Sequence, residues 1–251
     1  MRILQFTDCH LYADRHARLA GMCTYESLSQ VIAKACADSW PPAFVVFTGD
    51  LVDDASSAGY RSLNALLAAL NVPTFCLAGN HDAPSTMAAC LQAKNIFLSK
   101  TVVLENWRFF FLNTHVPNTD AGALGADQME WLVKMLSGAG GQHTLIFLHH
   151  PPISVGSAWM DAIGLEDGEE LLEKLARFEA IRGLVAGHVH QEFDAEQGGL
   201  RILTTPSTCV QFKPSSEQYE RDHLAPGYRW FELNADGSFE TGIERIRAPS
   251  V

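Results

Sequence analysis

The sequence predicts an α/β fold, a four-layer αββα sandwich in which two mixed β-sheets pack face to face and helices lie outside. Short apolar runs rich in β-formers alternate with helical patterns through the first hundred residues, as they do in parallel βαβ units. From residue 101 onward a hairpin pattern appears, so antiparallel pairing is expected as well. Several apolar runs end in glycine, aspartate, asparagine or histidine, and the carboxyl ends of strands in an open sheet are where ligands bind.

The first part of the chain is predicted to form three buried strands with helices between them. The run Phe44-Val45-Val46-Phe47 is continuously apolar, which is typical of a parallel strand covered on both faces. Thr24 is the expected N-cap of the first helix, and Ser56 or Ser57 starts the second. The polar stretch 11–23 is expected to be a loop. The predicted strands are 3–7, 44–47 and 72–78, and the predicted helices are 24–38, 56–70 and 84–93.

The second part of the chain is predicted to complete both sheets. Turn signals at Gly198-Gly199 and Asp236-Gly237 separate short strands near the C-terminus. No internal repeat, low-complexity tract or linker interrupts the pattern, so a single domain is predicted over residues 1–251. The elements predicted here are a hairpin of 101–105 and 107–112, helices at 127–136 and 169–178, and strands at 144–148, 181–186, 228–233 and 239–246.

Composition excludes several classes of function. The formal net charge is −11 and no cluster of lysine and arginine occurs, which argues against a nucleic-acid partner. No apolar run approaches the roughly 20 residues of a membrane span, and the N-terminus shows no signal peptide, so no membrane partner and a cytoplasmic location are expected. The six cysteines are spread without a CxxC pair, which predicts reduced thiols.

Five predicted strands end in side chains that bind metal ions. Oxygen and nitrogen ligands without thiolate suit Mn²⁺, iron or Zn²⁺. An aspartate or histidine two residues from a histidine on an extended segment would project to the same face. Seven side chains exceed the need of one tetrahedral ion and indicate two ions roughly 3.5–4 Å apart, bridged by a carboxylate. The seven are Asp8, His10, Asp50, Asn80, His149, His188 and His190, and His81 follows Asn80 directly.

These motifs, D-x-H, G-D, G-N-H-D, H and G-H-x-H in that order, resemble those of the calcineurin-type metallophosphoesterase superfamily. The resemblance implies the metallophosphoesterase fold and an iron and manganese pair, with zinc as an alternative. It implies one ion held by Asp8, His10 and His190, the other by Asn80, His149 and His188, and Asp50 as the bridge. His149 is chosen as the ligand because it follows the strand directly, and His150 is the alternative.

The resemblance also implies how the reaction proceeds. With two divalent ions, Asp8, Asp50 and a bridging hydroxide, about one positive charge remains, which a phosphodiester monoanion would neutralise. The hydroxide would attack phosphorus in line. His81 is the expected catalytic residue, stabilising charge or protonating the leaving group. The side chains expected to face the substrate are His10, Asp50, Asn80, His81 and His190.

The other histidines and aspartates near the motifs are not expected to bind the metal ions. His16, His115, His143 and His223 follow no motif and are expected to be surface or loop residues. Asp53 and Asp54 are expected in a solvated loop that leads to the second helix. Asp82 either orients a neighbouring ligand or closes the turn, and both interpretations stay open.

Over its whole length the sequence is similar to the bacterial class III cyclic nucleotide phosphodiesterases. The segments that carry this similarity are 2–8, 79–82 and above all 205–214, which contains no metal motif and is a candidate for the nucleotide pocket. The similarity implies hydrolysis of 3′,5′-cyclic AMP to 5′-AMP. The alternatives are a phosphodiesterase of broader specificity, acting on glycerophosphodiesters, other cyclic nucleotides or pyrophosphates, and a metal-free scaffold. The oligomeric state is left open, with a homodimer among the options.

Overall fold

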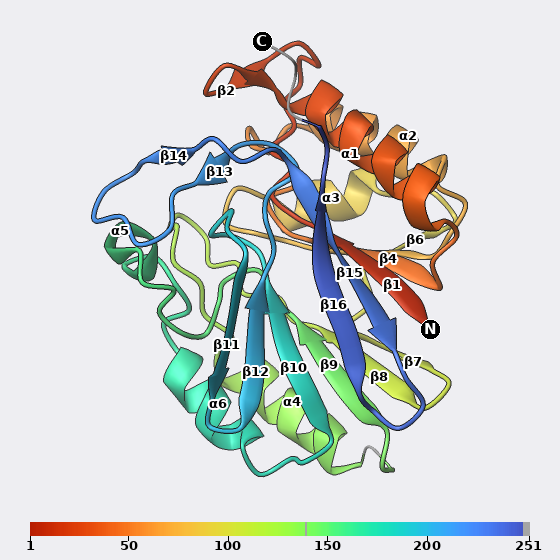
Figure 1. Ribbon diagram of the computed structural model, residues 1–251, viewed down its shortest axis with the longest axis vertical. Coiled ribbons are helices and arrows are strands. Elements are labelled where there is room, and N and C mark those ends of the chain that lie inside the picture. The colour runs from red at the N-terminus through yellow and green to blue at the C-terminus, as the bar shows by residue number, and fades with distance from the viewer. Residues whose placement is uncertain (139, 248–251) are drawn as a thin grey trace.

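The protein consists of two six-stranded sheets packed face to face with helices on their outer sides (Figure 1). This computed structural model describes residues 1–138 and 140–247. The predicted four-layer αββα architecture is confirmed, because separate apolar clusters lie between the two sheets and between each sheet and its helices.

The first sheet has the strand order β16-β15-β1-β4-β5-β6. Strands β1, β4, β5 and β6 are parallel, while β15 and β16 pair antiparallel at one edge. The turn at Asp236-Gly237 joins β15 to β16, as the sequence predicted. The strands span Arg2–Phe6 (β1), Phe44–Thr48 (β4), Thr74–Leu77 (β5), Ile96–Phe97 (β6), Gly227–Leu233 (β15) and Phe239–Arg245 (β16).

The second sheet has the order β11-β12-β10-β9-β8-β7. Its four central strands are parallel, and the edge strands β11 and β7 pair antiparallel. The predicted hairpin is therefore present as β7 and β8. The strands span Thr101–Leu104 (β7), Trp107–Phe111 (β8), His143–Phe147 (β9), Ile181–Ala186 (β10), Phe193–Gln197 (β11) and Leu200–Thr204 (β12).

The helices lie in two outer layers. α1 (Thr24–Ser39), α2 (Ser57–Ala68) and α3 (Pro84–Cys90) cover the first sheet, while α4 (Ala126–Ser137) and α6 (Gly168–Leu175) cover the second. Their buried leucines face the sheets, and large aromatic side chains fill the space between the sheets. The stack of Phe75 on Phe111, with ring centroids 4.6 Å apart, joins the two sheets.

The structure corrects the sequence-based assignment in a few places. Cys23, not Thr24, occupies the N-cap of α1, and no side chain caps that helix, whereas Ser56 caps α2 by accepting a hydrogen bond from Gly59 N. The stretch predicted as a loop contains the short hairpin of β2 (Arg18–Leu19) and β3 (Met22–Cys23). The sequence did not predict α5 (Ala158–Asp161), β13 (Gln211–Phe212) or β14 (Arg221–Asp222).

All six cysteines are free thiols, as predicted. Within the described residues, no helix has both the length and the apolar character that crossing a membrane requires.

Candidate metal centre

The loops after five parallel strands meet where the carboxyl ends of the two sheets come together. The loops after β1, β4 and β5 belong to the first sheet, and those after β9 and β10 to the second. Glycines allow these loops to approach one another closely. A Cβ atom on Gly79 would overlap the backbone and carboxylate of Asp50, and one on Gly187 would overlap the side chain of Thr7. Only glycine permits this close approach of one strand end to another.

Backbone amides hold the two central carboxylates in place. His188 N donates to both oxygens of Asp8, each at 3.1 Å, and His81 N donates to Asp50 Oδ1 at 2.9 Å. The amide donor therefore lies on the opposite sheet for Asp8 and on the neighbouring strand end for Asp50. Both carboxylates are buried, so these bonds fix the orientation of the carboxylate groups.

The backbone at the site is left-handed, and this corrects the reasoning used for the D-x-H and H-x-H pairs. Their side chains converge, but an extended segment does not explain the convergence. The positive φ angles tighten each strand end into a turn, a conformation that costs a non-glycine residue of order 1–3 kcal/mol. The residues and angles are Asp8 (54°), His10 (44°), Asp50 (50°), His188 (68°) and His190 (49°).

One group of candidate ligands consists of Asp8, His10 and His190, which offer atoms within 4.8 Å of one another. His10 Nε2 lies 3.1 Å from His190 Nε2, and His190 Nε2 lies 3.4 Å from Asp8 Oδ1. The other ring nitrogen of His190 donates to Val210 O at 2.8 Å. This second bond directs Nε2 of His190 into the centre.

Asp53 orients His10, so the expectation that it belongs to a solvated loop is wrong. Its Oδ1 lies 2.9 Å from His10 Nδ1 and 3.4 Å from His81 Nδ1, and its side chain is 21% exposed. Burial alone would raise the pKa of Asp53, but the hydrogen bond and charge of His10 hold that pKa below its usual value. Asp54 stays exposed and accepts from backbone amides, as a loop residue does.

The second group consists of Asn80, His149 and His188. Asn80 Oδ1 lies 3.1 Å from His149 Nε2 and 3.0 Å from His188 Nδ1. His149 Nδ1 donates to Thr48 O at 2.7 Å, so its Nε2 faces the centre. Asp50 Oδ2 lies between the groups, 3.4 Å from His149 Nε2 and 3.7 Å from His10 Nε2.

His150 offers a ring nitrogen within 4.8 Å of those of His149 and His188, but both of its ring nitrogens have other partners. Its Nδ1 lies 2.7 Å from Thr114 Oγ1 and its Nε2 lies 3.0 Å from Asp120 O, so the protein itself satisfies both ring nitrogens. Burial and the neighbouring His149 lower the pKa of His150 to about 3, which keeps the ring neutral. A neutral ring accepts from the threonine hydroxyl and donates to the carbonyl. The geometry therefore leaves His149 as the candidate ligand of this pair.

Asp82 supports the turns of the centre. It accepts hydrogen bonds from Gly79 N, Leu51 N and Val52 N and from the Tyr60 hydroxyl. Burial raises the pKa of Asp82, and the charge of Asp50 adds to the effect. Of the two interpretations left open, closure of the turn agrees with these contacts.

His115 comes closer to the centre than the sequence indicated. It follows β8, a sixth parallel strand that ends at the same edge, and its Nδ1 donates to Gly79 O at 3.0 Å. The signal for it was its position just after the strand predicted at 107–112. His143, by contrast, lies at the opposite end of β9 with Arg182.

The donor set fits metal ions. His188 Nε2 is buried without a hydrogen-bond partner among the described residues, and two imidazole nitrogens face each other across 3.1 Å. Burial alone would lower the pKa of His149, yet the charge of Asp50 raises it to about 9, so the field at His149 favours positive charge, whereas burial and the neighbouring histidines lower the pKa of His188. Metal cations would satisfy these lone pairs and complement that field.

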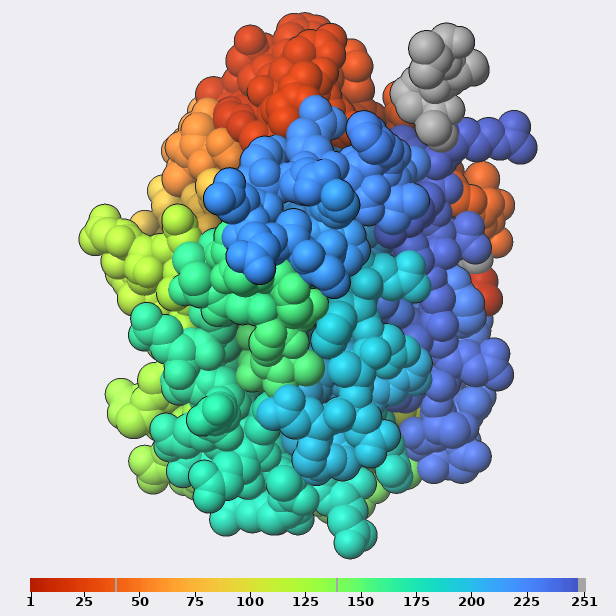
Figure 2. All heavy atoms as spheres, turned by 60° about the vertical axis from the view of Figure 1, so that its left-hand side comes forward, coloured from red at the N-terminus to blue at the C-terminus, as the bar shows by residue number. Residues whose placement is uncertain are grey.

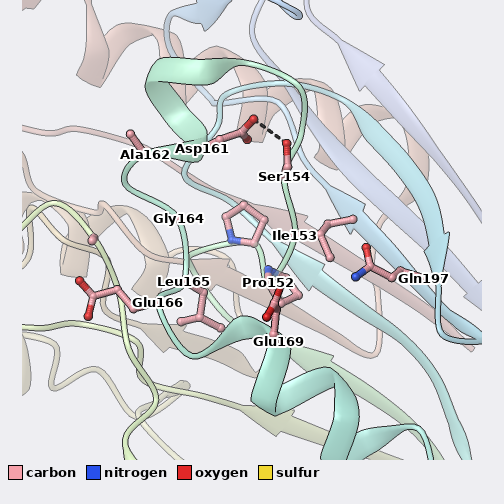
Figure 3. A pocket seen from close by; sticks show the side chains of 12 residues that line it. Pro152, Ile153, Ser154, Asp161, Ala162, Gly164, Leu165, Glu166, Glu169 and Gln197 are labelled. Atoms are coloured by element: carbon pink, nitrogen blue, oxygen red, sulfur yellow. Dashed lines mark hydrogen bonds between the residues drawn. The ribbon is translucent and has the colours of Figure 1, made fainter.

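A cavity of about 480 Å³ beside the loop after β9 is a poor site for a phosphoester (Figure 3). Pro152, Ile153 and Leu165 line it together with the carboxylates of Glu166 and Glu169. Anionic walls repel a phosphate group, and none of the candidate metal ligands lines this cavity. The metal centre is therefore where the arrangement can bind and polarise an anion.

Comparison with known proteins agrees with this geometry. The profile of the family described as calcineurin-like phosphoesterase matches residues 1–192. The chain is 40% identical over 244 residues to the 3′,5′-cyclic adenosine monophosphate phosphodiesterase CpdA of Pseudomonas aeruginosa, covering 97% of this chain and 89% of that protein. It is 40% identical over 247 residues to CpdA of Escherichia coli K12, covering 98% of this chain and 90% of that protein.

Among solved structures, the fold is similar to that of a dimetal phosphatase from Danio rerio, with a TM-score of 0.67 and 17% identity over 92% of this chain and 94% of the other. The resemblance stated from the sequence motifs is thus confirmed. The protein is a member of the calcineurin-like phosphoesterase family.

Proposed function

We propose that this protein is a phosphodiesterase that hydrolyses 3′,5′-cyclic AMP to 5′-AMP and so lowers the concentration of this nucleotide in the cytoplasm. The observation that supports this most strongly is the likeness to CpdA over 97% of the chain. In this chain all seven candidate ligands also converge on one centre. The substrate name comes from these relatives, and the chemistry comes from the centre.

Two metal ions are part of the proposal. Asp8, His10 and His190 would hold one, Asn80, His149 and His188 would hold the other, and Asp50 would face both. Iron and manganese are the expected pair, and zinc also suits the donor set. When bound, such a pair supplies charge stabilisation for the phosphoryl group and a water of lowered pKa as the nucleophile.

His81 is the proposed donor of a proton to the leaving oxygen. Its side chain is 38% exposed at the mouth of the centre, and its ring lies edge-on to His10 with centroids 4.9 Å apart. Asp53 Oδ1 lies 3.4 Å from Nδ1 of His81, which leaves Nε2 of the ring to face the substrate. After the transfer, His81 would take up a proton from solvent.

The acidic surface and the anionic substrate are compatible on this proposal. The protein carries a formal charge of −11, but two divalent ions outweigh the carboxylates of Asp8 and Asp50 locally. The neutral amide of Asn80 contributes an oxygen without a charge. A phosphodiester monoanion would therefore be attracted to the centre, although the surface as a whole repels anions.

The test compares kcat/KM for cyclic AMP, cyclic GMP, bis(p-nitrophenyl) phosphate and a glycerophosphodiester, with protein reconstituted in Mn²⁺. We expect cyclic AMP among the better substrates, 5′-AMP as the only nucleotide product, and two equivalents of bound metal. Hydrolysis of the artificial diester without hydrolysis of cyclic AMP would assign a different phosphodiester. Full activity in protein shown to be metal-free would refute the mechanism.

A further inference from the structure

Three aromatic side chains form a cluster beside the metal centre that the hydrolytic mechanism does not use. We call Trp159, Phe212 and Tyr219 the aromatic cluster. The Phe212 ring stacks on the ring of His190, with centroids 4.1 Å apart and planes 8° apart. Trp159 and Tyr219 pack against Phe212 and against each other in edge-to-face geometry, at 5.0 to 5.5 Å. The cluster therefore begins at a candidate metal ligand and extends away from it.

The outer end of the cluster faces solvent. Tyr219 is 55% exposed, so its ring is accessible to a ligand. Beside it lies a hollow of about 450 Å³ lined by the segment from Lys213 to Glu220, including Ser215 and Gln218. Figure 2 shows this segment, in blue, lying against the green segment that contains Trp159. An aromatic face next to a polar hollow suits a flat, polar ring.

The protein holds this cluster in place through bonds between separate segments. Trp159 Nε1 donates to Ser216 Oγ at 3.1 Å, and Ala158 N donates to Ser216 O at 3.1 Å. Lys213 N donates to Glu220 O at 2.8 Å, which closes the loop that carries Tyr219. The surface is thus preorganised for a ligand, so little ordering would accompany binding.

We infer that the Tyr219 face of the aromatic cluster stacks against the base of the cyclic nucleotide. The inference rests on the proposed function and names the part of the centre that recognises the nucleoside. In a cyclic nucleotide the ribose, fused to the phosphate ring, carries the base away from the phosphate. In the protein Phe212 stacks on His190 and Tyr219 packs against Phe212, so the cluster extends away from the metal centre in the same way. Gln218 adds hydrogen-bonding groups beside Tyr219 for the edge of the base.

The test measures kcat/KM of the variants Tyr219→Ala and Tyr219→Phe with two substrates. These are cyclic AMP and methyl p-nitrophenyl phosphate, a diester that has no base. Stacking of a base on an aromatic side chain predicts that Tyr219→Ala lowers kcat/KM for cyclic AMP by about tenfold or more. Tyr219→Phe retains the ring and should stay within about twofold of the wild type. The matched control is Leu224→Ala, an exposed apolar residue of the same region (53% exposed) outside the cluster.

Inhibition provides a second readout. In Tyr219→Ala the inhibition constant of 5′-AMP should rise by the same factor as the loss with cyclic AMP, while that of inorganic phosphate should not change. Equal losses of kcat/KM for cyclic AMP and for the base-free diester would show that the cluster only supports His190, and would overturn the inference. Unchanged kinetics with cyclic AMP would overturn it as well. Failure of the wild type to hydrolyse cyclic AMP, with the base-free diester still hydrolysed, would instead refute the proposed function.

Discussion

Replacement of Asp53 by alanine is expected to weaken metal binding although Asp53 is not one of the proposed ligands. Its carboxylate accepts the Nδ1 proton of His10 at 2.9 Å, and this bond turns Nε2 of His10 toward the centre. Charge-assisted hydrogen bonds contribute about 1.5–3 kcal/mol. That range corresponds to an approximately 10- to 150-fold change in an equilibrium constant. We therefore expect the Kd for Mn²⁺ to rise by that factor.

The assay is competition with a fluorescent chelator, read on protein first stripped of metal. Asp53→Asn keeps an acceptor oxygen but loses the charge and should lie between alanine and the wild type. The control is Asp54→Ala, because Asp54 accepts from the backbone amides of Ala13 and Ser56 and not from a histidine. A Kd within twofold of the wild type for Asp53→Ala would refute the reasoning that this carboxylate orients His10.

Three further predictions concern the centre itself. His81→Ala should lower kcat by about 100-fold or more with metal content unchanged, and loss of metal in this variant would instead make His81 a ligand. Asn80→Asp should raise KM for a phosphodiester by roughly 10- to 100-fold while both metals stay bound, because it places an extra negative charge beside the anion; unchanged KM would contradict this. His149→Ala should lose metal, whereas His150→Ala should keep it and lose about 1–3 kcal/mol of unfolding free energy, as buried partners of its ring become unpaired. Metal analysis and thermal melts separate these two outcomes, and the reverse result would make His150 the ligand.

Much of the fold could be predicted because several central strands are largely apolar runs of four or five residues, such as β4 and β5. Such runs carry a strong signal for buried strands, and the order of polar strand ends followed from them. The short pairs β2–β3 and β13–β14 have two residues per strand, so no periodicity could reveal them. The hairpin of β13 and β14 is also what positions the Tyr219 loop.

The candidate site, like the fold, could be predicted from the sequence only in part. The side chains that follow long strands could be located from the sequence, whereas Asp53 could not. Its place depends on the left-handed turn at Asp50, which sends the following loop back toward His10. His115 likewise reaches Gly79 only because β8 joins the second sheet beside β9. Both depend on contacts between distant segments, which local sequence patterns do not encode.

The position of the centre between the two sheets has a consequence for how the protein acquires metal. On the proposed assignment, each ion takes ligands from both sheets: Asp8 and His10 with His190, and Asn80 with His149 and His188. Neither sheet alone offers a complete coordination shell, so metallation and the docking of the two halves are thermodynamically linked. Each bound ion would link the two sheets, and its removal would loosen the interface between them at the end that holds the centre.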